Sequence, residues 1–424
     1  MTMQADLVVM GGGPAGTISA WLAAQDGRRV ILIDPDRAPS RIEGLSPRLQ
    51  NWLHRAGLLP HASVPLVRVP RRSLWAGTAY EGNHELLVSR PDLDRHLRDC
   101  AREAGATVVL DTATPAPGGA RMGSGGCVEA PLVLDARGRR AAGRDGTRRG
   151  PPTVAMGVWL DGPAETPPQT LIVPLDDGWV WFACMGSGRA WAQVTLNAAD
   201  PDKAPPPKRV ARALADCTEQ LPGFRPSGDA TVARECSPVL SPVPDDLSVL
   251  PVGDAAAAMD PLSGHGMFWA VSSAIAAAAV RRTLTADTDG SGRSLAGRFL
   301  GQRTEDVFLR QARIGRDFIR AETARASLPF WKARAAFPDD EPAHPTVPAI
   351  TTRRQVVVKD GRLTELEVLI SPRSPGGVGW FHDLPAADLW RAHAKGEDAV
   401  RLAQRFGPAA ARFPTWLAEE ATPG

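Results

Sequence analysis

The first turn of this chain leaves few folds open to it. Asp6 to Met10 is an apolar run typical of a buried parallel strand. Gly11, Gly13 and Gly16 follow in the order G-x-G-x-x-G, and a helical stretch runs from Thr17 to Gln25. In such a turn the first glycine permits the tight bend, the second lets the backbone approach a pyrophosphate, and the third lets the helix pack on the sheet. The helix then directs its free N–H groups at the phosphates.

A second apolar run, Arg29 to Ile33, ends at Asp34, which lies 21 residues beyond Gly13. A carboxylate at this point of a β-α-β unit accepts hydrogen bonds from the hydroxyls of a ribose. A bare G-x-G-x-x-G also occurs in simple glycine-rich turns, but here the strand, the helix, the second strand and the terminal acid are in register. The pattern therefore predicts a dinucleotide-binding domain with Asp34 on the ribose.

The composition narrows the class of protein. A chain of 424 residues is too long for one ordinary core, so we expect two or three domains. The net charge of +2 gives no reason to expect binding to nucleic acid or to a membrane surface. The five cysteines are odd in number and widely spaced, which predicts neither disulfides nor a metal site. The first strand begins within six residues of Met1 and no apolar run reaches the length of a membrane span, so we expect a cytoplasmic protein.

The order of patterns along the chain predicts three parts. Residues 1–150 and 230–335 form the discontinuous dinucleotide-binding domain, with a loop-rich region around Pro70 and Gly77. Four β-patterned runs within residues 151–229 predict an inserted antiparallel sheet that forms a substrate domain. The runs are Val154–Leu160, Thr170–Leu175, Trp179–Cys184 and Ala190–Asn197. Residues 345–424, after a proline-rich linker, predict a small C-terminal α+β module.

Two further strand ends carry an acid and a glycine. Leu132 to Asp135 is an apolar strand followed by Gly138, and Ser248 to Val252 is another, followed at once by Gly253-Asp254. The loop Asp260–Gly266 then opens a long helix from Met267 to Leu284. The N-terminus of that helix offers N–H donors and positive potential to a ring that gains negative charge on reduction, which is the property of a flavin.

Together these motifs resemble the FAD-binding fold of the glutathione-reductase and p-hydroxybenzoate-hydroxylase type. The resemblance covers roughly residues 5–325 and rests on the first turn, Arg90, Asp135-Ala-x-Gly138, Gly253-Asp254 and Pro261. It implies an α/β, Rossmann-like FAD domain in which Asp254 binds the ribityl chain. The residues that it assigns to FAD are Gly11, Gly13, Pro14, Ala15, Gly16, Asp34, Arg41, Arg90, Asp135, Gly253, Asp254, Pro261, Gly264, Gly266 and Met267.

Within this fold the sequence is similar to the branch of flavin-dependent halogenases, through Trp179-Val-Trp181 and Asp260–Gly266. Two departures argue against halogenation. The halogenase signature W-x-W-x-I-P continues here as Phe-Ala-Cys184 and lacks its Ile-Pro half. Halogenation also needs a lysine near the flavin, and this chain has no lysine before Lys203.

A halogenase-like flavoprotein without that lysine resembles the enzymes that hydroxylate a tryptophan of a polypeptide during quinone-cofactor biogenesis, of the type that serves quinohemoprotein amine dehydrogenase. The resemblance implies FAD, NADH or NADPH as reductant, O2 as co-substrate and the maturation of cysteine tryptophylquinone. Two alternatives remain open at this point. One is a hydroxylase of a free small aromatic molecule, and the other is a non-catalytic flavin-binding maturation partner.

The sequence identifies few catalytic side chains. His265, between Gly264 and Gly266, is the expected proton-exchanging group near the ring, although an exposed loop histidine fits the pattern equally well. Trp179 and Trp181 are candidates for the substrate pocket, and both are also consistent with simple core packing. His84 and Glu43 are weaker candidates for the same pocket. No metal ligand is expected.

The last 75 residues suggest how a polypeptide substrate is held. Two runs, Arg354–Val358 and Leu363–Ile370, pair across Asp360-Gly361, and three helical stretches follow. This order resembles a winged helix and is similar to the small domains that hold substrate peptides in peptide-modifying enzymes. We therefore expect residues 350–424 to help to dock the polypeptide, with a simple cap over the flavin domain as the alternative. Acids offset the bases of this module, which disfavours nucleic acid.

Overall fold

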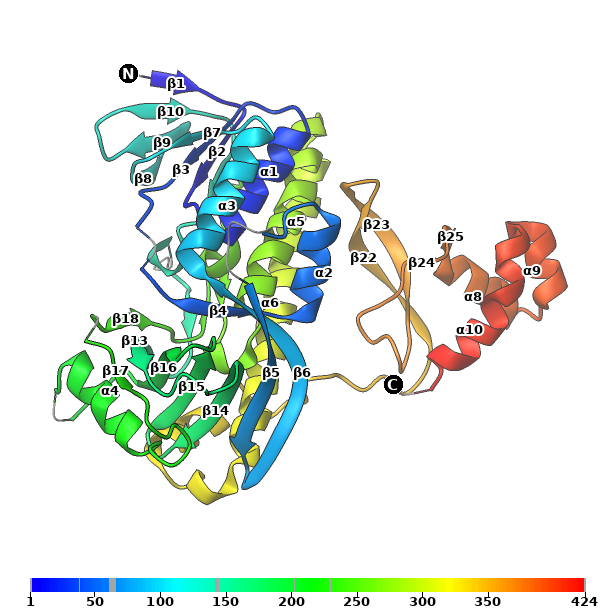
Figure 1. Ribbon diagram of the computed structural model, residues 1–424. Helices are drawn as coiled ribbons and strands as arrows, with labels where there is room; N and C mark the ends of the chain where they lie inside the picture. Colours follow the sequence, from blue (N-terminus) through cyan, green and yellow to red (C-terminus); the bar gives the residue numbers. More distant parts are fainter. Residues whose placement is uncertain are drawn as a thin grey trace. The chain divides into compact units, whose positions relative to one another are not determined.

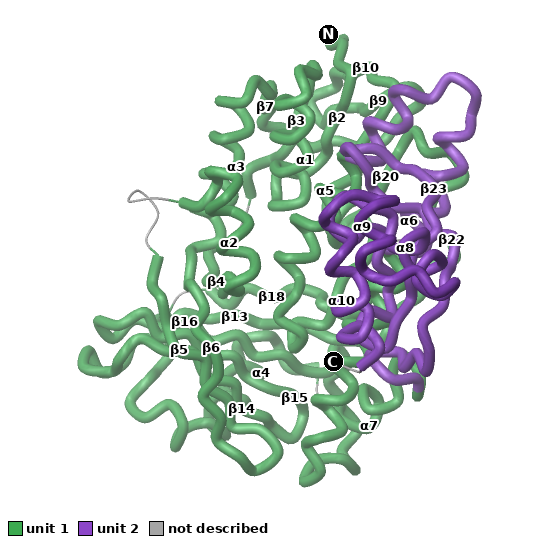
Figure 2. The backbone as a smooth tube through the Cα atoms, turned by 90° about the vertical axis from the view of Figure 1, so that its right-hand side faces the viewer, with its two compact units in different colours: residues 1–278, 304–340 green, residues 279–303, 341–424 purple. Residues whose placement is uncertain are grey.

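The computed structural model describes residues 2–37, 39–60, 66–141, 145–201, 203–228 and 230–422. The chain forms two compact units, which Figure 2 distinguishes by colour. Unit 1 contains residues 1–278 and 304–340, and unit 2 contains residues 279–303 and 341–424. Two long helices, α5 (Gly266–Ala286) and α6 (Ser291–Ala321), supply residues to both units. Residues 279–303 therefore belong with the C-terminal residues, whereas the sequence placed them in the FAD domain.

A five-stranded parallel sheet organises the first part of unit 1, in the order β20-β11-β2-β3-β7. The central strands are buried throughout, which explains why their sequences are continuously apolar rather than alternating. The strands are β2 (Leu7–Met10), β3 (Val30–Ile33), β7 (Thr107–Val109), β11 (Val133–Asp135) and β20 (Val249–Pro251).

Both faces of this sheet are covered. Helices α1 (Pro14–Gln25) and α3 (Arg90–Glu103) lie side by side on one face (Figure 1). On the other face, Val8 and Met10 pack against Ala120 and Val128 of a small second sheet. The strands of that sheet are β1 (Thr2–Gln4), β10 (Cys127–Glu129), β9 (Gly119–Met122) and β8 (Ala113–Ala116). Layers of helices, parallel sheet and antiparallel sheet agree with the predicted FAD-binding fold.

Among the described residues, nine strands build a second large sheet in unit 1. The four predicted runs are present as β13 (Thr153–Asp161), β14 (Gln169–Leu175), β15 (Gly178–Cys184) and β16 (Arg189–Asn197), each within one residue of its expected ends. The other strands are β17 (Arg225–Pro226), β18 (Val232–Glu235), β5 (Leu66–Trp75), β6 (Thr78–Ser89) and β4 (Ile42–Leu45).

The predicted loop-rich region around Pro70 and Gly77 is wrong. Residues 66–89 form the long ribbon of β5 and β6, and β5 extends the sheet by pairing in parallel with β14. The ladder tolerates Pro70 because the register shifts there, between Pro70 and Arg72. Gly77 lies in the tight turn of the ribbon with a φ of +71°, a conformation that favours glycine. The sheet predicted within residues 151–229 therefore also takes strands from residues 42–89.

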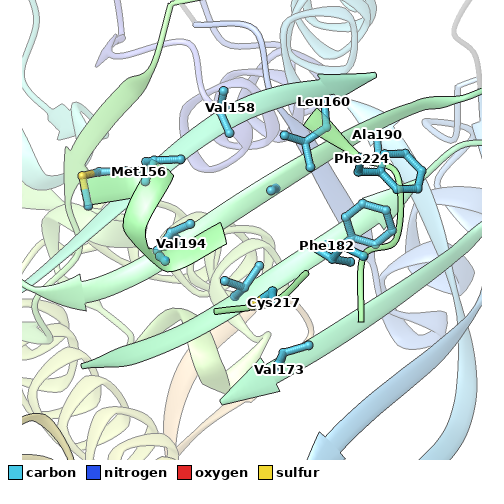
Figure 3. Packing of buried hydrophobic residues seen from close by; sticks show 14 of the residues in the cluster. Met156, Val158, Leu160, Val173, Phe182, Ala190, Val194, Cys217 and Phe224 are labelled. Atoms are coloured by element: carbon cyan, nitrogen blue, oxygen red, sulfur yellow. The ribbon is translucent and has the colours of Figure 1, made fainter. Parts of the chain in front are cut away.

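The nine-stranded sheet packs on one side against helix α4 (Pro206–Ala215). Met156, Phe182 and Cys217 lie in the buried cluster on this side (Figure 3). Val180 and Val210 belong to the same cluster. Because side chains alternate along a strand, Trp179 and Trp181 point to the opposite side, together with Trp159 and Trp191. Short elements complete unit 1: α2 (Pro47–Arg55), α7 (Pro329–Ala335), β12 (Arg148–Arg149), β19 (Val239–Leu240) and β21 (Ala257–Ala258).

Unit 2 is built on the predicted hairpin. Strands β22 (Thr351–Lys359) and β23 (Arg362–Ile370) join at Asp360-Gly361, which both have positive φ angles, as a two-residue turn of this kind requires. The backbone N–H of Leu363 donates to Thr283 Oγ1 in α5 over 2.8 Å, so the hairpin is fixed to residues of the same unit. The strands β24 (Trp380–Phe381) and β25 (Leu384–Pro385) and the helices α8 (Ala386–Ala394), α9 (Ala399–Phe406) and α10 (Phe413–Glu420) follow. The winged-helix likeness stays a prediction.

Candidate FAD site

The first turn is closed by direct backbone contacts. Gly11 has a φ of +103°, and a Cβ on it would lie 2.4 Å from the carbonyl oxygen of Ala136. A Cβ on Gly16 would lie 1.8 Å from the carbonyl oxygen of Gly11. Both distances are shorter than any non-bonded contact permits, so α1 can pack against the sheet only when these positions are glycine.

Gly13 behaves differently from its two partners. Its φ is −74°, and the nearest atom to a Cβ placed on it is Nη2 of Arg90, 3.4 Å away. The turn is therefore open at Gly13, where the free N–H groups of α1 begin. Pro14 occupies the first helical position and gives up an N–H that has no partner in the helix, and Ala15 follows it. This opening, at a positive helix end beside a guanidinium, fits the diphosphate of FAD.

Asp34, the predicted ribose ligand, also fixes the turn. Its Oδ2 accepts the backbone N–H of Gly12 at 2.6 Å and its Oδ1 accepts the backbone N–H of Asp36 at 2.9 Å. The Arg98 guanidinium lies 3.4 Å from Oδ1. Asp135 serves a similar structural purpose, because its buried carboxylate receives two hydrogen bonds of 2.8 Å from Arg137. Both acids lie at the carboxyl ends of parallel strands, β3 and β11, which flank β2, and ligands of such sheets bind at this edge.

A cluster of arginines and carboxylates lies next to the glycine turn that precedes α1. Arg41 donates to Glu43 at 2.9 Å, and Arg90 donates to Asp94 at 2.8 Å and lies 3.4 Å from Glu43. Arg234 of β18 approaches the same Glu43 carboxylate at 3.7 Å. The structure thus brings Arg41 and Arg90 together and places Glu43 in an ion-pair network.

The charges of this cluster are strongly coupled. Burial alone would raise the pKa of Glu43, but Arg41, Arg234 and Arg90 together lower it to about 2. Burial likewise opposes the charge on Arg90, yet Asp94, Glu43 and Asp254 hold its pKa above its ordinary value. Glu43 and Arg90 therefore stay charged at neutral pH.

The ionisation of Glu43 predicts a pH-dependent contribution to stability. Its pKa is about 2 in the folded protein and 4.5 ordinarily, so its contribution is complete above pH 4.5 and is lost as the pH falls towards 2. We expect Glu43→Gln to lower the free energy of unfolding by about 3 kcal/mol at pH 7, and by much less at pH 3. Urea unfolding at both pH values measures this difference. The exposed pair of Glu81 and Arg72 gives the control, since Glu81→Gln is expected to cost less than about 1 kcal/mol. If Glu43→Gln lost the same free energy of unfolding at pH 7 and at pH 3, the lowered pKa assigned to Glu43 would be contradicted.

Gly253-Asp254 reaches the same place from the edge strand β20. Gly253 has a φ of +64°, its N–H donates to Ser273 Oγ at 2.9 Å, and Trp269 Nε1 donates to its carbonyl oxygen at 3.1 Å. The next carboxylate, Asp254, is 39% exposed and lies 3.8 Å from Arg139 Nε. The partial removal of this carboxylate from water raises its pKa, against the opposing attraction of Arg139, Arg90 and Arg234. A carboxylate with oxygens open to a ligand fits the ribityl hydroxyls of FAD.

The loop before α5 completes the site. Asp260 accepts the N–H of Leu262 at 2.9 Å, Pro261 begins a short turn, and Gly264 closes it with a φ of +62°. Helix α5 then begins at Gly266, followed by Met267, as predicted to within one residue. His265 is exposed, and its Nδ1 is hydrogen-bonded to the carbonyl oxygen of Ser263. The loop therefore presents an accessible imidazole, and the first N–H groups of α5 follow it directly.

The predicted pocket residues are placed differently from one another. Trp179 is 3% exposed and packs with Phe330 and Trp331, whereas Trp181 is only partly buried against the same cluster. Leu262 belongs to the loop Asp260–Gly266, here called the flavin loop, and also packs on this cluster. This contact connects the tryptophan side of the large sheet to the flavin loop. His84 is exposed on β6 and is not brought to the FAD site.

Three charged residues of the site were not identified from the sequence. Asp94 is four residues after Arg90 on α3, a spacing that does signal a helical ion pair. Arg139 and Arg234 carried no such signal, because each acts on residues more than 90 positions away in the chain.

All five lysines, at positions 203, 208, 332, 359 and 395, are exposed, so none is buried in this site. No described helix is both long and apolar enough to span a bilayer.

Comparison with known proteins agrees with this geometry. No model of a protein family matches the sequence. Among solved structures, the chain is similar to one described as the peptidyl tryptophan dihydroxylase QhpG, essential for tryptophylquinone cofactor biogenesis. The two are 32% identical over 99% of this chain and 100% of that one, with a TM-score of 0.85.

More distant structures share the fold. The flavin-dependent halogenase CmlS is 17% identical over 98% of this chain and 94% of that one, with a TM-score of 0.76. A geranylgeranyl bacteriochlorophyll reductase-like protein of Thermoplasma acidophilum is 22% identical over 77% of this chain and 88% of that one, with a TM-score of 0.59. The menaquinone reductase of Mycolicibacterium smegmatis is 31% identical over 128 residues, or 26% of this chain. That match spans only 30% of the reductase.

Proposed function

Because the chain belongs to the family of the peptidyl tryptophan dihydroxylase QhpG, we propose that it is an FAD-dependent monooxygenase that hydroxylates a tryptophan side chain of a polypeptide during tryptophylquinone biogenesis. As a member of this family it is a flavoenzyme and an oxidoreductase. FAD, when bound, supplies electron transfer from NADH or NADPH and the activation of O2. The protein holds the cofactor through the open turn at Gly13, the arginine cluster and Asp254. It places the flavin ring on the tryptophan side of the large sheet.

The observation that carries this proposal is the identity over the full length of both chains, which includes the residues of unit 2. Halogenases share the fold at much lower identity. Their chemistry needs an amine close to the flavin, and each lysine of this chain is exposed. Hydroxylation needs no such amine, because the oxygen is transferred directly to the ring of the substrate.

Turnover of the reductant tests the proposal. The FAD-loaded protein is mixed with NADH or NADPH and, in parallel, with the tryptophan-containing precursor of a tryptophylquinone protein, with free tryptophan, or with neither. We expect the precursor, but not free tryptophan, to raise the rate at which the reductant is oxidised. Equal stimulation by free tryptophan would indicate a hydroxylase of small aromatic molecules. No stimulation by either would indicate a flavin-binding partner without catalysis.

The polypeptide is proposed to dock partly on residues 350–424. In unit 2, β22 pairs with β23 on one side only, and no other described strand pairs with it. Such an edge can add an extended peptide through backbone hydrogen bonds. Val358, 41% exposed on β22, offers an apolar contact beside this edge.

Amide hydrogen exchange measures docking on this edge. Adding the precursor polypeptide to the FAD-loaded protein is expected to slow the exchange of amides in Thr351–Lys359, because amides that point away from β23 would gain partners. Strand β6 is the internal control, since no second strand of the described chain pairs with its residues 78–84, which are almost all exposed. Protection confined to β6, or absent from both strands, would contradict docking on β22.

A further inference from the structure

A buried carboxylate lies on the tryptophan side of the large sheet and has no part in the FAD site. Glu85 of β6 is only 7% exposed. It is held by Thr170 of β14, whose hydroxyl donates to Oε1 at 2.6 Å. Thr170 is two residues before Ile172, which lies directly opposite Trp181 in the sheet. Glu85 therefore faces the same side as the tryptophans.

One oxygen of this carboxylate is left without a donor. Oε1 receives the Thr170 hydroxyl and lies 3.6 Å from Nε of Arg71, while no described group donates to Oε2. Oε2 occupies a space that exists only because residue 44 is glycine, since a Cβ there would lie 1.8 Å from it. Oε2 is not one of the described side-chain atoms that are both fully enclosed and without a partner, so water or a ligand can reach it. This oxygen is therefore free to accept a hydrogen bond from a bound substrate.

Arg71 connects this carboxylate to the flavin loop. Its side chain is 42% exposed, and its Nη2 lies 4.0 Å from the place that a Cβ on Gly264 would take. Gly264 and His265 precede the N-terminus of α5, which the FAD ring is expected to face. Glu85 is thus one arginine side chain away from the loop at which the chemistry takes place.

We propose that Oε2 of Glu85 accepts the hydroxyl hydrogen of the once-hydroxylated tryptophan ring and serves as the base for the second hydroxylation. This inference rests on the proposed function. It assigns to Glu85 a substrate contact that distinguishes a hydroxylated ring from an unmodified one. Arg71 and Thr170 are positioning residues that keep the carboxylate in place.

The second hydroxylation consumes one O2 and two electrons from NADH or NADPH. One oxygen atom forms the new bond to a ring carbon and the other leaves as water. As this bond forms, the electron pair of the existing O–H bond moves into the ring and its proton passes to Oε2 of Glu85. The oxidised carbon then loses its hydrogen as a proton, Glu85 returns its proton to the ring oxygen, and the ring becomes aromatic again. Positioned bases of this kind contribute about 10²- to 10⁴-fold in rate.

The test compares Glu85→Gln with Glu81→Gln in the FAD-loaded protein, with the precursor polypeptide as substrate. Glu81 is the matched control, because it lies on the same strand and pairs with an arginine of β5 but is exposed. We expect Glu85→Gln to accumulate the monohydroxylated polypeptide, with the second step slowed about 10²-fold and the first changed by less than about threefold. Glu81→Gln is expected to form the dihydroxylated product like the unaltered protein. Mass spectrometry of the polypeptide over time follows both steps.

A binding measurement separates contact from mere packing. Flavin absorbance reports the binding of a hydroxyindole and of its methyl ether, which lacks the hydrogen that Oε2 would accept. The unaltered protein is expected to prefer the hydroxyindole about tenfold or more, and Glu85→Gln to lose this preference. Gly44→Ala is a second variant, which keeps the carboxylate but displaces Oε2. It replaces Glu85→Gln in both measurements if that protein does not retain FAD. We expect it to show the same slow second hydroxylation and the same loss of preference for the hydroxyindole. A Glu85→Gln protein that dihydroxylates at the normal rate, or in which both steps slow equally, would overturn the proposal while leaving the proposed function intact.

Discussion

Gly16→Ala is expected to yield a protein that is largely unfolded and free of FAD. The new methyl group would lie 1.8 Å from the carbonyl oxygen of Gly11, and neither backbone can yield without separating α1 from the sheet. We expect a loss of about 4 kcal/mol or more, a large part of the stability of a typical domain. Urea unfolding and the ratio of flavin to protein absorbance measure the two effects. Gly13→Ala is the control for stability, because its φ of −74° suits alanine and only Arg90 Nη2 lies near, at 3.4 Å. Full flavin occupancy in Gly16→Ala would contradict the assigned turn.

Gly13→Glu is expected to fold but to lose FAD. The side chain would extend into the opening between the N-terminus of α1 and Arg90, and its carboxylate would take the place of a phosphate. We expect the affinity for FAD to fall by about 10³-fold, because the diphosphate would meet both a steric block and a like charge. Flavin fluorescence during titration of the FAD-free protein measures the affinity. Gly13→Ala is expected to lose much less, and equal retention of FAD by both variants would place the diphosphate elsewhere.

The sequence was sufficient for the parts of the fold that are built locally. The first turn, Gly253-Asp254, the start of α5 and the four strands β13–β16 were predicted because each carries its own signal in consecutive residues. The ribbon of β5 and β6 was not. Pro70 and Gly77 suggest a loop, and residues 78–84 show no alternation because they are exposed almost throughout. Pairing of β5 with β14, about 100 residues away, decides the structure there.

The same limit applies to the site. Glycines that shape a turn are visible in the sequence, but the ion pairs around Glu43 join β4, α3 and β18 and are created only by folding. Glu85 and Thr170 are separated by 85 positions and share no motif, so their contact had no signal in one sequence. The division of the chain was hidden for a similar reason, since α5 and α6 are continuous helices that contribute to both units.

This division also affects the design of experiments on unit 2. A truncation at residue 340 would remove β22 and β23 from the α5 residues that they contact, including Thr283, which is hydrogen-bonded to Leu363. Loss of activity in such a protein would report damaged helices as much as lost docking. Hydrogen exchange in the intact protein avoids this ambiguity.

We propose above all that this protein transfers oxygen, and not halogen, to a tryptophan of a polypeptide. The direct test incubates the FAD-loaded protein with NADH or NADPH, isotopically labelled O2, bromide and the tryptophan-containing precursor of a tryptophylquinone protein, and then sequences the product by mass spectrometry. We expect labelled oxygen on the ring of a single tryptophan and no bromine. Bromine on the ring, or consumption of the reductant without label in the polypeptide, would contradict it.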